Sequence, residues 1–395
     1  MGELIESDRQ EVERYYQTLS TWIRLHGAEH LGTRYVVVRL ARMEVTGPLD
    51  FSDIQRILGR VVDLRTWYDA WHAEAIQAEE MGERFIAEGR IVSAGDMFHR
   101  ASMCHHWGQY LARVGSEQKI EGRAGRVRCY RRAIEHLDTR IEPLQIPFDG
   151  TRLPGYLHLP DAMGAAEGAL PCVIMVNGAD SVKEEYHNWA RQFARRGLAV
   201  LTMDGPGQGE LVGVLPMRPD AWEEPVGAAI DALAASGTVD ADRVGIWGSS
   251  MGGFLALRAA AFEPRVRAAI SSGGFYDFRD YRYWPVSTQL NVMEDLMVDS
   301  LSEARAYIEE RCSLAGTVET IGSPYLVIHG ARDELVSVEE GRQMAGGSLA
   351  EFVNFEDGFH TCTNYNATLV PLMCDWMSDR LHAVRGASDE QRKEE

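Results

Sequence analysis

The segment Gly248-Ser249-Ser250-Met251-Gly252 fits the pattern G-x-S-x-G. In this pattern a serine stands on a sharp turn between a strand and a helix, with crowded neighbours two positions away on each side. Glycine at both positions relieves the crowding, because it has no Cβ. Only Ser250 has both glycines in register, since Ser249 would need glycine where Trp247 and Met251 stand. The pattern therefore predicts Ser250 as a nucleophile.

The residues on both sides of this motif favour the same interpretation over a tight turn with an incidental serine. The apolar run Val244–Trp247 predicts a short buried parallel strand. After the motif, residues 254–261 are rich in alanine and leucine, which favours a helix, and Pro264 ends it. Strand, turn and helix thus occur in the order that a nucleophile elbow requires.

A serine hydroxyl needs a base, and the base needs a carboxylate to orient it. In α/β-hydrolases the chain order is serine, acid, histidine. Asp333 follows the predicted strand Tyr325–His329, and His360 follows the predicted strand Phe352–Phe355. We therefore expect Ser250, Asp333 and His360 to form a catalytic triad.

Three neighbouring residues are alternatives to this acid and this base. Glu334 is adjacent to Asp333, and Asp357 is close to His360, although it also suits a turn. His329 ends a predicted strand and is better explained as a packed or loop-bonding histidine.

A developing oxyanion also needs hydrogen-bond donors. The backbone N–H of Met251 is one candidate, and the loop 177–181 after the predicted strand Cys172–Val176 should supply the second. Gly178 permits close backbone approach, so we expect the amide of Ala179, or of a residue adjacent to it, to be that donor.

The spacing of apolar residues along the chain predicts a helical N-terminal domain, residues 1–140, and an α/β domain, residues 141–385. In the second domain strands and helices alternate, which predicts a doubly wound, mostly parallel sheet. Residues 275–320 form a helical insertion, which we expect to act as a cap over the site together with the helical domain. Residues 386–395 are predicted to be an acidic, frayed tail.

Composition narrows the class of protein. The net charge is −19, and residues 146–395 hold 20 Lys and Arg against 37 Asp and Glu. Neither residues 1–145 nor residues 146–395 offer a basic surface for nucleic acid or anionic lipid.

The apolar runs are too short for a transmembrane helix, and the N-terminus lacks the apolar core of a signal peptide. Six cysteines without a C-x-x-C pair favour reduced thiols, so we expect a cytoplasmic protein that acts on a small molecule.

Several further residues are candidates for substrate contact. Residues 98–107 are rich in histidine and aromatic residues, including His99, His105 and His106. Because no carboxylate stands at ligand spacing beside them, we expect no metal site; helix packing explains them best, with substrate contact by His106 as the alternative. Asp180 in the oxyanion loop and Tyr186 at the start of the next helix are further candidates, although capping explains Tyr186 equally well.

Two stretches, residues 177–185 and 202–210, carry a more specific signal. With the long helical N-terminal region, they resemble the group of α/β-hydrolases that contains 2,6-dihydroxypseudooxynicotine hydrolase and the yellowish-green-type polyketide-shortening hydrolases. The likeness spans about residues 90–385. It implies a cofactor-free enzyme, a homodimer, and triad positions at Ser250, Asp333 and His360. A further carboxylate of the nicotine enzyme falls near Asp277 or Asp280, where this chain has no glutamate.

The loop Asp204–Glu210 contains three glycines but is not a dinucleotide-binding motif, because it follows the second strand of its unit and no helix begins in it. A compact loop beside the site is the better interpretation.

Members of the group hydrolyse carbon–carbon bonds next to a ketone, and close relatives are esterases. The resemblance thus implies a hydrolase of ketonic carbon–carbon bonds. A carboxylesterase, or an acyltransferase or cyclase that uses the same acyl-enzyme, is the alternative. A non-catalytic binding protein on this scaffold is less consistent with an intact triad.

Overall fold

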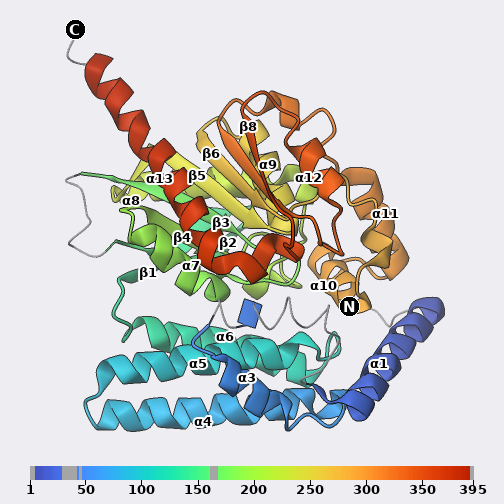
Figure 1. The fold of residues 1–395 in the computed structure, drawn as a ribbon. Helices are drawn as coiled ribbons and strands as arrows, with labels where there is room; N and C mark the ends of the chain where they lie inside the picture. Colours follow the sequence, from blue (N-terminus) through green and yellow to red (C-terminus); the bar gives the residue numbers. More distant parts are fainter. Residues whose placement is uncertain (1–4, 29–41, 44–46, 161–167, 392–395) are drawn as a thin grey trace. The chain divides into compact units, whose positions relative to one another are not determined.

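The computed structural model describes residues 5–28, 42–43, 47–160 and 168–391 of the chain (Figure 1). The chain divides into two compact units, a helical unit and an α/β unit. The helical unit consists of Met1–Arg140, Pro285–Glu294 and Val298–Glu303; the α/β unit consists of Ile141–Trp284, Asp295–Met297 and Ala304–Glu395.

The helical unit is built from amphipathic helices that bury aromatic side chains. Its helices are α1 Glu6–His26, α3 Phe51–Leu58, α4 Trp67–Ala87, α5 Ile91–Tyr110, α6 Glu117–Ile134 and most of α10 Val286–Leu296. Helices α4, α5 and α6 run side by side (Figure 1). Trp71 of α4 and Trp107 of α5 are fully buried in the core between these helices.

Residues 285–294 belong to the helical unit, whereas the sequence places them in an insertion of the α/β domain. Hydrogen bonds explain the difference. Ser287 bonds the Tyr15 hydroxyl at 3.0 Å, the Asn291 side chain accepts from Lys119 Nζ at 3.1 Å, and Glu294 accepts from Arg123 at 2.8 Å.

The α/β unit is organised around an eight-stranded sheet with the order β1-β2-β4-β3-β5-β6-β7-β8. The strands are β1 Ile141–Phe148, β2 Thr151–His158, β3 Leu170–Val176, β4 Ala199–Met203, β5 Val239–Ser249, β6 Val266–Ser272, β7 Tyr325–Gly330 and β8 Ala350–Phe355. Strand β2 pairs antiparallel with β1 and β4, and all other pairs are parallel. Every residue of β3 is buried, as expected for the centre of a sheet covered on both faces.

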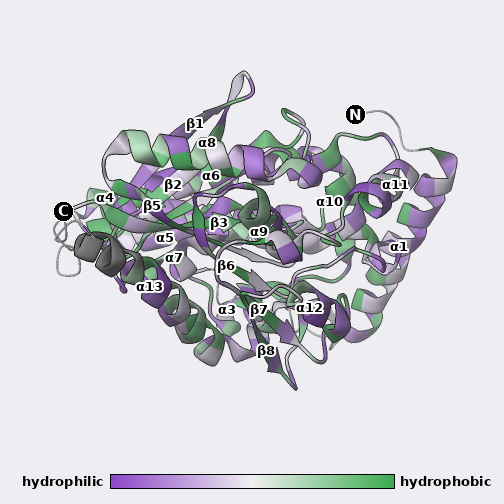
Figure 2. Ribbon diagram, turned by 90° about the horizontal axis from the view of Figure 1, so that it is seen from above, coloured by the Kyte–Doolittle hydropathy of each residue, from purple (hydrophilic) through white to green (hydrophobic). Residues whose placement is uncertain are grey.

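Helices cover this sheet: α7 His187–Ala194, α8 Glu223–Ser236, α9 Met251–Phe262, α12 Val338–Met344 and α13 Asn366–Gln391, with α11 Leu301–Arg311 between β6 and β7. Hydrophobic and hydrophilic residues are interleaved along most helices, as expected for helices with one buried face (Figure 2). Helix α13 continues to Gln391, so the predicted frayed tail is helical as far as that residue; residues 392–395 lie outside the described part. Within the described residues, no helix combines the length and apolarity needed to cross a membrane.

Candidate active site

Ser250 lies on the turn between β5 and α9 with φ 57° and ψ −126°, a conformation that non-glycine residues rarely adopt. Its amide donates to the Ser272 carbonyl at 2.9 Å, which ties the turn to β6. The two glycines of the motif are sterically required. A Cβ on Gly248 would lie 2.0 Å from the Gly252 carbonyl oxygen, and a Cβ on Gly252 would lie 2.5 Å from the Val176 carbonyl oxygen.

The structure brings Ser250, His360 and Asp333 together in one hydrogen-bonded chain. His360 Nε2 lies 2.9 Å from Ser250 Oγ, and His360 Nδ1 lies 2.8 Å from Asp333 Oδ2. The Asp333 side chain is fully buried and that of His360 is 12% exposed. The three residues follow β5, β7 and β8, so the carboxyl ends of three parallel strands supply them.

Backbone amides and a second histidine hold the Asp333 carboxylate in place. Asp333 Oδ1 accepts from the amides of Leu335 and Val336 at 2.9 and 3.0 Å. Burial lowers the pKa of His329, so its imidazole is neutral, and Nε2 donates to the Val336 carbonyl at 3.0 Å. His329 therefore bonds the loop that presents the acid.

The alternatives to this acid lie at the surface. Glu334 is exposed. Asp357 is 59% exposed and pairs with Arg332 at 2.6 Å. Neither carboxylate has a hydrogen bond to His360 among those found in the described chain.

The segment after His360 carries backbone strain. Thr361 and Cys362 have φ values of 58° and 55°, in the left-handed region that a β-branched residue rarely enters. Gly273 is close to this turn, since a Cβ there would lie 2.7 Å from the Thr361 amide nitrogen. Strain of this kind concentrates where a fold fixes a functional side chain.

Two backbone amides beside Ser250 suit an oxyanion. The Met251 amide begins α9, and the Ala179 amide lies in the loop after β3. In the described part of the chain, neither amide donates to a protein acceptor. The Gly178 amide, in contrast, donates to Ser181 Oγ at 2.6 Å, which favours Ala179 as the donor. Gly178 also lies close to Ser250, because a Cβ on it would lie 3.6 Å from Ser250 Cβ.

The predicted substrate contacts lie in three places. Asp180 is half-buried in the loop after β3, and the buried Tyr186 bonds Ser181 Oγ at 3.0 Å. Asp280 is half-buried at the start of a 3-10 turn, Tyr281–Tyr283. His106 is buried in α5 of the helical unit, with its ring against the edge of Trp107. Substrate contact by these four residues stays a prediction.

One histidine of α5 has a carboxylate beside it in space, although none stands at ligand spacing along the sequence. Glu79, His105 and Cys129 offer ligand atoms within 4.8 Å of one another. They come from α4, α5 and α6, so spacing along one segment could not reveal them. Glu79 is already engaged, because it accepts from His105 Nε2 at 2.8 Å and from Arg128 at 2.9 and 3.1 Å.

An ionic cluster around the buried Lys183 lies next to the loop 177–181, and the sequence does not predict it. Lys183 Nζ lies 2.7 Å from Asp204, 2.7 Å from Glu184 and 2.8 Å from Glu210. Both stretches that carry the family resemblance contribute to it. We call these four residues the Lys183 cluster.

Comparisons with known proteins identify related hydrolases. The model of the esterase FrsA-like family matches residues 53–302, and that of the prolyl oligopeptidase family matches residues 224–381. The 2,6-dihydropseudooxynicotine hydrolase of Paenarthrobacter nicotinovorans is 33% identical over 340 residues, which cover 85% of this chain and 90% of that protein. Hydrolase acrC of Aspergillus aculeatus is 35% identical over 238 residues, which cover 55% of this chain and 55% of that protein.

Solved structures agree with the sequence relatives. The crystal structure of the 2,6-dihydroxy-pseudo-oxynicotine hydrolase has a TM-score of 0.79 and 31% identity, and the match covers 87% of this chain and 96% of that chain. AbyA5, at 20% identity and a TM-score of 0.71, shows a likeness of fold alone. The chain therefore belongs to the FrsA-like esterase family of α/β-hydrolases and is an enzyme related to 2,6-dihydropseudooxynicotine hydrolase.

Proposed function

We propose that this enzyme is a serine hydrolase that cleaves a carbon–carbon bond adjacent to a ketone in an aromatic or polyketide-like small molecule. The observation that carries the proposal is the hydrogen-bonded chain from Ser250 Oγ through His360 to Asp333, at 2.9 and 2.8 Å. The relation to 2,6-dihydropseudooxynicotine hydrolase supports the ketonic substrate class.

The proposed reaction begins when His360 Nε2 accepts the Ser250 proton while Oγ attacks the ketone carbon. The buried Asp333 orients the imidazole through Nδ1 and stabilises its positive charge. The amides of Met251 and Ala179 bind the oxyanion. Collapse of the intermediate breaks the carbon–carbon bond, and the carbanion that leaves takes the proton from His360. Water, deprotonated by His360, then releases the acyl group as a carboxylic acid.

An ester is the second candidate substrate, because the matching family is described as FrsA-like esterases. The same groups would act, with an alkoxide in place of the carbanion as the leaving group. An acyltransferase or cyclase would differ only in the nucleophile that accepts the acyl group. The carbanion requires delocalisation that the substrate itself supplies, so the substrate decides between these reactions.

Labelling with a fluorophosphonate tests the nucleophile. We expect one equivalent of label on Ser250 in the folded wild type and none in Ser250→Ala, measured by mass spectrometry of the intact protein and its peptides. A folded wild type that takes no label at Ser250 would contradict every serine-hydrolase assignment.

Matched aryl-ketone and aryl-ester substrates test the bond. Carboxylic acid and protonated leaving group from the ketone, quantified by chromatography, support the carbon–carbon reaction. Turnover of the ester alone contradicts the carbon–carbon reaction and supports a carboxylesterase.

A further inference from the structure

The Lys183 cluster lies outside the triad, yet its central carboxylate reaches the loop that holds Ala179. Asp204 directly follows β4 and is fully buried. Its Oδ1 accepts from Asn177 Nδ2 at 3.0 Å and from the Lys183 amide at 3.0 Å. Asn177 begins the loop that holds Ala179, and Lys183 follows the end of that loop. A single oxygen atom of Asp204 therefore joins the two ends of the loop.

The second oxygen of Asp204 is bound just as fully. Asp204 Oδ2 accepts from Lys183 Nζ at 2.7 Å and from the Glu210 amide at 3.1 Å. Burial alone would lower the pKa of Lys183, but the carboxylates of Asp204, Glu184 and Glu210 raise it, so the ammonium stays charged. A charged lysine in turn stabilises Asp204 as a buried anion.

A second residue of the loop after β4 also bonds Asn177. Gln208 Nε2 donates to the Asn177 carbonyl at 3.0 Å, and the Gln208 side-chain oxygen accepts from the Gly205 amide at 3.2 Å. Gly209 has φ 51°, and a Cβ there would lie 2.0 Å from Asp204 Oδ2. The glycine-rich loop thus wraps closely around the Asp204 carboxylate and holds the residue that precedes Gly178.

We propose that Asp204 is a positioning residue that fixes the Ala179 amide at the distance from Ser250 that oxyanion binding requires. The inference rests on the proposed serine-hydrolase mechanism. Asp204 acts through Asn177 and Lys183, to which its carboxylate is bonded. Because oxyanion donors act by preorganisation, a small displacement of this loop lowers the rate without removing the triad.

Asp204→Asn tests the proposal with little change of shape. The amide oxygen can still accept from Asn177 and from the Lys183 backbone, but its NH₂ group would face two donors, Lys183 Nζ and the Glu210 amide. We expect kcat for an activated aryl ester, and the rate of fluorophosphonate labelling, to fall about 10- to 100-fold. KM should be unchanged, so the loss should appear in kcat alone.

Glu74→Gln is the matched control, because Glu74 is also a buried carboxylate with several cationic partners but bonds no residue of the oxyanion loop. We expect it to retain the wild-type kcat. A folded Asp204→Asn protein with kcat within twofold of wild type would overturn the inference. Should Asp204→Asn fail to fold, Asn177→Ala keeps Asp204 in place but removes the side-chain bonds from Asn177 to Asp204 and to the Met203 carbonyl. It is expected to lower kcat in the same direction, and an unchanged kcat there also overturns the inference.

This test separates the inference from the proposed function. Absence of labelling at Ser250 in the wild type contradicts the serine-hydrolase mechanism itself. Normal labelling of the wild type with equally fast labelling of folded Asp204→Asn contradicts only the role of Asp204.

Discussion

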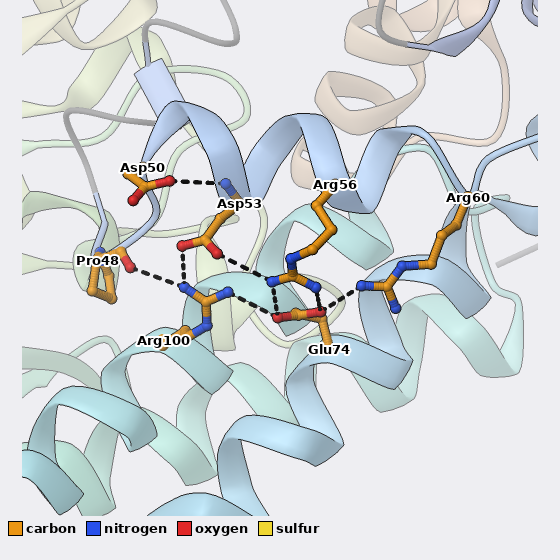
Figure 3. Close-up of polar contacts among 7 residues, drawn as sticks. All are labelled: Pro48, Asp50, Asp53, Arg56, Arg60, Glu74 and Arg100. Carbon is orange, nitrogen blue, oxygen red and sulfur yellow. Dashed lines mark hydrogen bonds and ion pairs between the residues drawn. The ribbon is translucent and has the colours of Figure 1, made fainter.

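The two units each contain an ionic cluster around one buried charged side chain, and the two clusters have opposite charge patterns. In the helical unit, Glu74 accepts hydrogen bonds from Arg56, Arg60 and Arg100 (Figure 3). In the α/β unit, Lys183 pairs with the carboxylates of the Lys183 cluster. One cluster is an anion among cations, and the other is a cation among anions.

The difference lies in what each cluster joins. Glu74 joins α3, α4 and α5, and its partners Arg56 and Arg60 are 48% and 38% exposed. Arg100 also pairs with Asp53 of α3 and donates to the Pro48 carbonyl (Figure 3). Lys183 and Asp204 are 1% and 0% exposed and join two loops beside Ser250. We therefore expect the Glu74 cluster to affect stability and the buried carboxylates of the α/β unit to affect rate.

We expect the largest effect on rate from Asp333→Asn, because the Asp333 carboxylate bonds the proposed base His360 directly. Asparagine would keep the bonds from Leu335 and Val336 but present an NH₂ group or a neutral oxygen to His360, which favours the wrong tautomer. We expect kcat to fall about 10⁴-fold with stability reduced much less. Steady-state kinetics with an activated ester and thermal unfolding measure the two effects.

Glu334→Gln is the control for this prediction, because Glu334 is adjacent but exposed. It should behave as wild type. If Asp333→Asn retained more than a tenth of the wild-type kcat, Asp333 would not be the acid that orients His360. The expectation that buried carboxylates of the α/β unit affect rate would then be weakened.

Glu74→Gln should show the opposite behaviour to Asp333→Asn. It leaves three arginines sharing a neutral amide, and we expect a loss of about 2 kcal/mol in the free energy of unfolding, with kcat unchanged. Urea unfolding followed by circular dichroism measures the loss. A large fall in kcat with little loss of stability would show that the division of roles between the clusters is wrong.

The hydrogen-bonded arrangement of Ser250, Asp333 and His360 could be predicted because each residue has a local signal. Ser250 stands between two required glycines, and Asp333 and His360 each follow a short apolar strand. Parallel strands bring their carboxyl ends to one edge of the sheet, so three local signals define one site.

The Lys183 cluster could not be predicted in the same way. Asp204 meets Lys183 across 21 positions, and Gln208 meets Asn177 across 31. The sequence marks both stretches as unusual but does not show that one carboxylate joins them. The same holds for residues 285–294, whose apolar pattern predicts a helix without revealing which unit it packs against.

The pH dependence of stability sharpens the assignment of Glu74. The hydrogen bond from Arg56, with those from Arg100 and Arg60, outweighs burial and lowers the pKa of Glu74 from 4.5 to about 2. A lowered folded-state pKa gives stability that is present above pH 4.5 and is lost as the pH falls toward 2. The difference in stability between wild type and Glu74→Gln should therefore shrink between pH 4.5 and pH 2. Urea titrations at several pH values test this, and a difference that stays constant would contradict the ionic role.

Glu79→Gln should have a smaller effect on stability than Glu74→Gln. Burial acts to raise the pKa of Glu79, but the His105 hydrogen bond and the Arg128 charge lower it to about 2. The Glu79 side chain is 24% exposed and Arg128 is 55% exposed, so water replaces part of the lost interaction. We expect a loss of about 1 kcal/mol in the free energy of unfolding, measured by urea unfolding.

Glu83→Gln is the control, because Glu83 lies one turn along α4 and is 56% exposed. Its loss in the free energy of unfolding should be smaller. A loss for Glu79→Gln as large as that for Glu74→Gln would mean that the number of arginine partners does not set the stability of these helices.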